Sequence, residues 1–206
     1  MVKFSKEVIV LVNGSFPKHS FPLSYLTKSK TIICADGAAN TAIKNNINPD
    51  YIIGDMDSIE KKYLSNKKII ENKDQNTTDL EKVLNWCILN KIQKIILLGF
   101  SGKMEDHFLA NFYITSYYSK KINIKIITDY FTILHLEKFK KIKCKTKTRI
   151  SIIKALNNPI ITTKGLLYEI NNTNLDLPSH GISNQVINNS FSISIKNGSI
   201  FLFIAN

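Results

Sequence analysis

The sequence predicts an α/β protein in two parts, an N-terminal domain with a mostly parallel sheet and flanking helices and a C-terminal antiparallel β-sandwich. Over the first 130 residues, short apolar and β-branched runs alternate with helix-like segments, which is typical of βα units. Beyond that point the helix-like segments stop, and alternating segments punctuated by Gly, Pro and Asn follow. We therefore expect domains at 1–130 and 131–206.

Six short apolar runs are the expected strands of the first domain. They lie at 8–12, 31–35, 51–53, 68–70, 95–98 and 124–128. The clearest helix covers 78–90, because apolar residues recur on one face and Thr78 and Glu81 form a capping box. A second helix covers 105–119. Its expected inward-facing residues are Phe108, Leu109, Phe112 and Tyr113.

The second domain is expected to contain strands and no helix. The candidate segments are 138–150, 151–155, 160–163, 166–170, 191–196 and 199–204. The stretch 138–149 carries seven basic residues, and we interpret it as a solvated edge strand that its lysines protect from pairing with other chains. A site for a polyanion is the alternative interpretation.

The composition limits the possible classes of protein. With 206 residues, 44 % of them hydrophobic, the chain can bury a sizeable core. Its apolar runs are far shorter than the roughly 20 residues of a membrane-spanning helix, and the N-terminus lacks the pattern of a signal peptide. The three cysteines are widely spaced and form neither a disulfide framework nor a zinc site. We expect a cytoplasmic protein with no membrane partner.

The net charge of +12 raises the question of nucleic-acid binding. It results from 28 basic and 16 acidic residues, but all the basic residues except Arg149 are lysines. Arginine is the residue suited to bidentate contacts with phosphates and bases. We therefore expect no nucleic-acid partner, and a non-enzymatic nucleic-acid binder is the less favoured alternative.

The acidic residues are concentrated in one third of the chain. Eleven of the sixteen lie between Asp36 and Asp106. In a lysine-rich chain this concentration indicates a bound divalent cation, since Mg²⁺ prefers oxygen ligands. A simpler interpretation is that some of these residues cap helices, which we expect of Glu60, Glu71 and Glu81.

Asp55 and Asp57 give the strongest local signal. They directly follow the predicted strand 51–53, and residues two apart in extended backbone project to the same side. Both carboxylates can therefore bind one Mg²⁺ just beyond the strand end. An ordinary surface turn explains the same residues about equally well. Metal-dependent transferases of several kinds, among them diphosphokinases and nucleotide-sugar transferases, would use such an Asp-x-Asp pair.

Asp79 and Lys82 lie in the first turns of the predicted helix 78–90. The helix dipole favours a negative group at Asp79, so helix stabilisation alone is a sufficient explanation. The same position can hold a metal while the free N–H groups of the turn meet phosphate oxygens. Lys82 is expected to face the same way as Asp79, because residues three apart are neighbours on a helix.

Two further motifs also follow predicted strands. The segment 99–107 contains glycines that let backbone N–H groups approach a phosphate closely. Within it, His107 beside Asp106 is a candidate acid or base, although a hydrogen-bonded structural histidine is the more common case. The segment 36–40 follows the strand 31–35. Open α/β sheets bind ligands at the carboxyl ends of their strands, so the four motifs together indicate a ligand site there.

In this order, the motifs resemble those of the thiamine pyrophosphokinase family. They read Asp36-Gly37-Ala38-Ala39-Asn40, Gly54-Asp55-Met56-Asp57-Ser58, Asp74-Gln75-Asn76-Thr77-Thr78-Asp79 and the 99–107 loop. A late segment, Gly181-Ile182-Ser183-Asn184, looks like that family's thiamine-side motif. The resemblance covers nearly the whole chain.

The resemblance implies a Rossmann-like nucleotide domain, a β-sandwich that binds thiamine and supports dimerisation, and a homodimer with its active sites between subunits. It implies transfer of the pyrophosphoryl group of ATP to thiamine, giving thiamine diphosphate and AMP, with Mg²⁺ as cofactor. The catalytic and metal-binding residues would be Asp55, Asp57 and Asp79. The ATP-binding residues would be Asp36, Asn40, Gln75, Thr78, Lys82, Gly99, Ser101, Gly102, Asp106 and His107. The thiamine-binding residues would be Ser183 and Asn184.

Two positions depart from the pattern of the family. Lys103-Met104 stands where the family often has Gly-Arg, so Lys103 or Lys82 would have to neutralise the triphosphate as a point charge. Gln185 stands in place of the usual Glu. A role that needs a carboxylate at that position would be lost.

Overall fold

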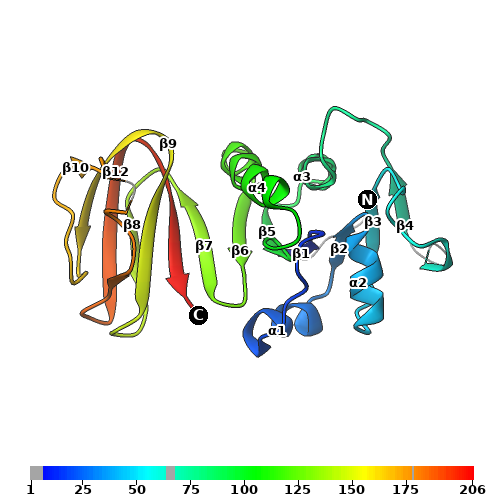
Figure 1. The fold of residues 1–206 in the computed structure, drawn as a ribbon, viewed down its shortest axis with the longest axis horizontal. Coiled ribbons are helices and arrows are strands. Elements are labelled where there is room, and N and C mark those ends of the chain that lie inside the picture. The colour runs from blue at the N-terminus through cyan, green and yellow to red at the C-terminus, as the bar shows by residue number, and fades with distance from the viewer. Residues whose placement is uncertain (1–6, 64–67, 178) are drawn as a thin grey trace. The chain divides into compact units, whose positions relative to one another are not determined.

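The computed structural model describes residues 7–63, 68–177 and 179–206. The chain divides into two compact units, Met1–Asp129 and Tyr130–Asn206. Each unit contains its own set of paired strands (Figure 1). Together they give a mixed α/β protein, as the sequence predicts.

The sheet of the first unit is entirely parallel. Its strands are β1 (Val8–Leu11), β2 (Ile32–Ala35), β3 (Tyr51–Gly54), β4 (Lys68–Glu71), β5 (Lys94–Leu98) and β6 (Asn123–Ile127). They pair in the order β6-β5-β1-β2-β3-β4. All six expected strands are confirmed to within one residue at each end. The strand order reverses direction between β1 and β5, and such a switch point is where open α/β sheets bind ligands.

Helices cover both faces of this sheet. They are α1 (Ser20–Lys28), α2 (Ala38–Lys44), α3 (Asp79–Leu89) and α4 (Glu105–Tyr118), with a short 3-10 helix η1 (Lys61–Tyr63). Figure 1 shows α3 and α4 on one side and α1 and α2 on the other. Alternate residues of the strands supply the two faces. Ile9, Cys34 and Ile52 share a buried cluster with the alanines of α2.

The prediction for the inward face of α4 is wrong at two residues. Leu109 and Tyr113 are 58 % and 61 % exposed, and Phe108 is itself 37 % exposed. The buried residues of α4 are Asn111, Thr115, Ser116 and Tyr118. Apolar residues lie on nearly every side of this helix, so their periodicity does not single out one face.

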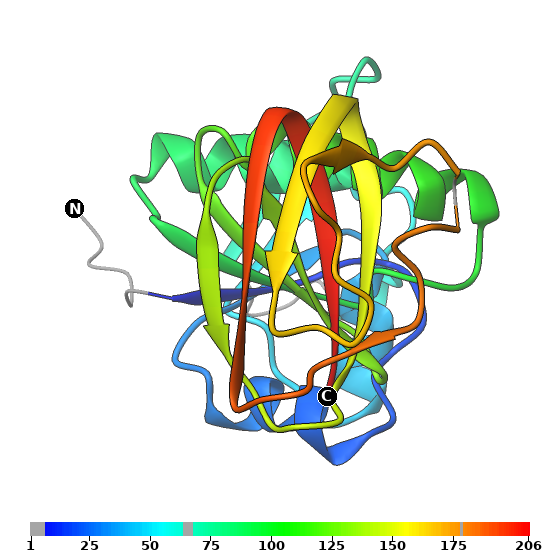
Figure 2. The same ribbon diagram turned by 90° about the vertical axis from the view of Figure 1, so that its left-hand side faces the viewer.

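The second unit is antiparallel and contains no helix among its described residues. Its strands are β7 (Phe131–Leu136), β8 (Lys140–Lys143), β9 (Arg149–Lys164), β10 (Thr173–Asn174), β11 (Asn184–Gln185) and β12 (Ser190–Ala205). The path runs β10-β9-β12-β7, with β8 on β12 and β11 on β9. Figure 2 shows β9 and β12 each bending sharply along their length.

Four strand predictions for this unit are corrected. Of the expected strand 138–150, only 140–143 forms β8, and 149–150 begin β9. The segments 151–155 and 160–163 form one strand, β9, and the segments 191–196 and 199–204 form β12. The register shifts near Gly198 in β12, opposite Asn157 in β9. Asn157 and Gly198, which suggested ends of strands in the sequence, therefore lie at a bend within two strands that remain paired. The segment 166–170 is a loop with a single bridge from Leu166 to Val186.

No helix in the described part of the chain is long and apolar enough to cross a membrane.

Candidate active site

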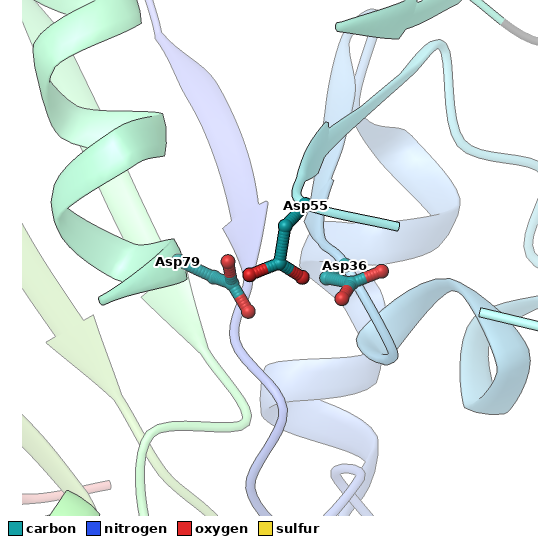
Figure 3. A group of neighbouring side chains, drawn as sticks. All are labelled: Asp36, Asp55 and Asp79. Carbon is teal, nitrogen blue, oxygen red and sulfur yellow. The ribbon is translucent and has the colours of Figure 1, made fainter. Parts of the chain in front are cut away.

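Three aspartates meet at the carboxyl edge of the parallel sheet. Asp36 follows β2, Asp55 follows β3, and Asp79 is the first residue of α3. One carboxylate oxygen from each lies within 4.8 Å of the other two. Figure 3 shows these side chains converging from separate elements. The group could hold a metal ion.

Asp36 is the most deeply buried of the three. It is fully buried and adopts a left-handed backbone conformation, with φ 36°. Its Oδ2 accepts a hydrogen bond from the N–H of Ser58 at 3.3 Å, while its Oδ1 has no hydrogen-bond partner. Burial raises the pKa of Asp36 to about 6. Gly54 is necessary beside it, since a Cβ there would lie 2.6 Å from the Cβ of Asp36.

Lys82 joins the other two carboxylates. Its Nζ lies 3.1 Å from Oδ2 of Asp55 and 3.0 Å from Oδ1 of Asp79, and the residue is only 3 % exposed. The bond from Lys82 lowers the pKa of Asp55 to about 2, whereas burial raises the pKa of Asp79. Burial opposes the charge on Lys82, but the two carboxylates outweigh it and raise the pKa of the ammonium group.

The start of α3 places Asp79 and Lys82. Thr78 is the N-cap, and its Oγ1 accepts from the N–H of Glu81 at 3.4 Å. Oε2 of Glu81 accepts from the N–H of Thr78 at 3.0 Å, so the predicted capping box is confirmed. The helix therefore begins at Asp79. As predicted, Lys82 lies one turn later on the same face.

The loop before α3 is held by its own side chains. Asp74 accepts hydrogen bonds from the N–H of Asn76 and the hydroxyl of Thr77, both at 2.9 Å. The first of these bonds is the main reason that the pKa of Asp74 is lowered. This shape brings Gln75 to the cluster, where its Nε2 donates to Oδ2 of Asp55 at 3.3 Å.

The loops after β1 and β5 are joined to each other. The N–H of Gly14 donates to the carbonyl of Gly99 at 2.8 Å, and the N–H of Ser15 donates to the carbonyl of Ser101 at 2.7 Å. Gly99 and Gly102 have φ values of 64° and 82°, a conformation that favours glycine. Each loop thus fixes the backbone of the other.

These segments enclose a cavity of about 320 Å³ in the first unit. Seven of the predicted site residues line it. They are Asp55, Gln75, Thr78, Asp79, Lys82, Gly102 and His107. The lining has a charged side at Asp55 and Asp79 and an apolar side at Phe100 and Phe108, whose rings pack edge to face.

Other predicted residues lie beside the cavity rather than in its lining. Asn40 fixes the loop after β3 through bonds to the backbone of Ser58 and Glu60 at 2.8 and 2.9 Å. Asp57 accepts a hydrogen bond from the hydroxyl of Ser58 at 2.8 Å. Asp106 accepts from the N–H of His107 at 2.7 Å. Gly99 and Ser101 act through the backbone bonds described above.

Two of the three glutamates expected to cap helices do not do so. Glu60 forms ion pairs with Lys44 and Lys62, both at 2.6 Å. Glu71 is part of β4 and pairs with Lys73. Only Glu81 has the expected capping role.

The lining also includes residues that the sequence analysis does not assign to a site. Asn13 and Gly14 are among them, and Oδ1 of Asn13 accepts a hydrogen bond from Nζ of Lys103 at 2.7 Å. The available signal was the Asn-Gly pair directly after the first strand, at the same edge of the sheet as the other motifs.

The two predicted thiamine residues belong to the second unit. Asn184 is 4 % exposed, and its amide accepts from the N–H of Tyr168 at 3.1 Å and donates to the carbonyl of Tyr168 at 2.6 Å. Ser183 has a φ of 62°, and its hydroxyl accepts from Arg149 at 2.9 Å. In this structure both side chains organise their own unit.

Comparison with known protein families assigns both units. Residues 23–127 match the domain described as "Thiamin pyrophosphokinase, catalytic domain", and residues 137–200 match "Thiamin pyrophosphokinase, vitamin B1 binding domain". The chain belongs to the thiamin pyrophosphokinase family. This confirms the resemblance seen in the motifs.

Individual relatives agree with membership of the thiamin pyrophosphokinase family. Thiamine pyrophosphokinase 1 of Arabidopsis thaliana is 31 % identical over 134 residues, which are 52 % of this chain and 49 % of that protein. The matched part thus spans about half the length of the plant relative. Thiamine pyrophosphokinase of Bacillus subtilis is 28 % identical over 216 residues, covering 96 % of this chain and 97 % of that protein.

Solved structures show the same fold. The crystal structure of the Bacillus subtilis thiamine pyrophosphokinase has a TM-score of 0.80 at 24 % identity and covers 97 % of this chain and 99 % of that one. The thiamin pyrophosphokinase from Candida albicans has a TM-score of 0.76 at 22 % identity, covering 96 % and 88 %. At these sequence identities, the two comparisons show a shared fold and nothing further.

Proposed function

We propose that this chain transfers the pyrophosphoryl group of ATP to the hydroxyl of thiamine, giving thiamine diphosphate and AMP. Family membership supports this activity. The observation that carries it is the carboxylate and lysine cluster at the carboxyl edge of the sheet, since Asp55, Asp79 and Lys82 line a cavity together with the loops after β1 and β5. A phosphate-transfer enzyme needs charge of both signs at such a place.

The donor set fits a divalent cation such as Mg²⁺. Three carboxylate oxygens lie together, all hard ligands, and Oδ1 of Asp36 is buried without a partner. Asp36, Asp55 and Asp79 would hold the ion. We keep Asp57 as a further ligand, because its carboxylate lies near enough to Asp36 and Asp79 to influence the pKa of both. When bound, the cation would supply charge neutralisation for the phosphates.

The other residues of the cavity would bind and align the polyphosphate. The backbone of the 99–103 loop is fixed by its bonds to the loop after β1, and Lys103 adds a positive charge. The first turn of α3 offers free N–H donors. In the proposed step, the thiamine hydroxyl oxygen bonds to the β-phosphorus while the bond from the β-phosphorus to the bridging oxygen breaks. AMP leaves with that oxygen and its electron pair, and a nearby carboxylate accepts the hydroxyl proton. Alignment carries this reaction, since its transition state is loose and needs no strong base.

The second unit would contribute the thiamine side of the site. Asn184 is expected to act by holding the loop at Tyr168. Ser183 has a left-handed backbone conformation, which we expect to set the direction of the chain on either side of it. We also propose a homodimer with its sites between subunits, located in the cytoplasm. Asn40, Gln75, Thr78, Asp106 and His107 would complete the ATP site.

We further infer the finer architecture of both units. The parallel order with helices on both faces supports a Rossmann-like nucleotide domain. In the second unit, residues from both halves of the bent strands share one core, including Ile152 and Ile161 of β9 and Ile193 and Ile200 of β12. That shared core supports a β-sandwich whose layers are the two halves of the bent sheet.

The direct test is product formation. Purified protein is incubated with ATP, Mg²⁺ and thiamine, and thiamine diphosphate and AMP are separated by chromatography. We expect equal amounts of both products, none with EDTA and none without thiamine. AMP release that leaves thiamine unchanged would contradict the proposal and indicate a different acceptor.

A further inference from the structure

Lys82 is an unusual residue for its position. Among the described residues it is the one lysine that is buried, and α3 buries it together with the apolar residues Leu80, Val83, Leu84 and Cys87. Burying an ammonium group is costly unless it is paired. Here the ammonium group of Lys82 forms ion pairs with two carboxylates, those of Asp55 and Asp79.

The charges of the cluster do not balance without a further cation. Three carboxylates face one ammonium group, so the cluster is left with an excess of about two negative charges when all are ionised. Lys82 contacts only two of the carboxylates, and Oδ1 of the third, Asp36, has no partner. The imbalance matches one divalent cation.

We propose that Lys82 is a built-in counter-ion and positioning residue that holds Asp55 and Asp79 in place before the divalent cation arrives and limits the affinity of the cluster for that cation. The inference rests on the proposed function only in taking the cation to be the Mg²⁺ of the reaction. Lys82 touches one oxygen of each carboxylate, which leaves the second oxygen for the ion.

The proposal predicts the direction in which cation affinity changes when Lys82 is replaced, and a purely structural lysine would not give that direction. A positive charge beside the cluster repels an incoming divalent cation, and this repulsion is strong where solvent is excluded. Removing the charge should therefore tighten binding of the cation. If Lys82 only held the carboxylates in place and did not limit affinity through its charge, its removal would loosen them and weaken binding.

The experiment measures Mn²⁺ affinity without nucleotide, by electron paramagnetic resonance and by calorimetry. Lys82→Met, which keeps the length of the side chain without its charge, is expected to bind Mn²⁺ at least about tenfold more tightly than the unmodified chain. Lys82→Arg should stay within about threefold. Lys44→Met is the matched control, because Lys44 also pairs with a carboxylate, Glu60, but is exposed; its affinity should stay within about twofold.

Thermal unfolding provides the second readout. In EDTA, Lys82→Met is expected to unfold at a lower temperature than the unmodified chain. Addition of Mn²⁺ should raise the Tm of the variant by more than it raises the Tm of the unmodified chain. If that variant does not fold, Lys82→Gln serves in its place. Weaker Mn²⁺ binding by the neutral variants would overturn the proposal. The outcome is independent of the product assay, so failure to form thiamine diphosphate would remove the proposed function and leave this result standing.

Discussion

The three clustered aspartates are chemically identical residues in different surroundings. Asp55 has its pKa lowered by Lys82, while Asp36 and Asp79 have theirs raised by burial. An empty cluster therefore keeps Asp55 ionised and penalises charge on its neighbours. The residues that would bind the cation also weaken the fold in its absence.

Substitution of Asp55 should affect turnover more than substitution of Asp57. Asp55 contacts Lys82 and Gln75 and belongs to the three-oxygen group, whereas Asp57 contacts Ser58. We expect Asp55→Asn to lower kcat/KM at least about 100-fold and Asp57→Asn about tenfold. Steady-state kinetics over a range of Mg²⁺ concentrations measures both. Near-normal turnover of Asp57→Asn would remove that residue from the metal site.

Asp36→Asn should stabilise the metal-free protein at neutral pH. The folded-state pKa of about 6 exceeds the ordinary value of 3.8, so the folded state favours protonated Asp36 and loses stability as pH rises from about 4 through 6. In EDTA at pH 8 the variant should be more stable by about 1–3 kcal/mol, a difference that disappears below pH 4. Urea unfolding at several pH values tests this. A difference that does not change with pH would contradict it.

Sequence spacing could identify most of the cluster but could not rank its members. Asp55 follows a strand, and Asp79 and Lys82 share a helix face, so their placement depends on local periodicity. Asp36 becomes a neighbour of Asp55 only because β2 pairs with β3. That strand order results from tertiary packing, which local patterns do not specify. Asp57 is closer in sequence but lies outside the group of three.

At the scale of elements, the N-terminus of α3 connects helix stability with the site. Thr78→Ala removes the N-cap bond and should reduce the free energy of unfolding by about 1 kcal/mol. Thr78→Ser keeps the hydroxyl and is the matched control. Because Thr78 also lines the cavity, stability measured by urea denaturation is the readout. Equal stability of the two variants would show that the cap contributes nothing.

The joined loops after β1 and β5 should not tolerate a side chain at Gly14. A Cβ there would lie 2.3 Å and 2.5 Å from the backbone carbonyls of Gly99 and Ser101, so the backbone must move. Gly14→Ala is expected to cost about 1–3 kcal/mol. At Gly37 the nearest atom is the movable side-chain amide of Asn13, at 2.8 Å, so Gly37→Ala should cost less. Chemical denaturation of both variants makes the comparison, and equal losses would contradict it.

Helices and strands were predictable where the local sequence pattern is compatible with only one kind of element. The strands of the first unit are short, apolar and bounded, so their limits follow from the sequence. In β9 and β12, Asn157 and Gly198 suggested strand ends, but pairing between the two strands continues through the bend. The exposed face of α4 was not predictable, because this helix buries the polar residues Asn111, Thr115 and Ser116 and exposes apolar ones, the reverse of the usual pattern.

At the scale of the whole molecule, the chain is expected to form a homodimer. Light scattering during gel filtration should give a mass twice the 23.4 kDa of one chain. Exposed aromatic and aliphatic side chains on α4, among them Tyr113 and Tyr117, offer apolar surface of the kind that interfaces cover. A mass of one chain at micromolar concentration would contradict this expectation.

The pairing of β2 with β3 also fixes the place of Asp36 relative to the other two carboxylates. Ala35 is in register with Ile53, and the N–H of Asp36 donates to the carbonyl of Ile53. A slip of two residues keeps the apolar faces matched but moves Asp36 by about 7 Å along the strand, more than the 4.8 Å that joins the three oxygens. Packing of apolar side chains alone would therefore not exclude this register, whereas formation of the three-carboxylate group would.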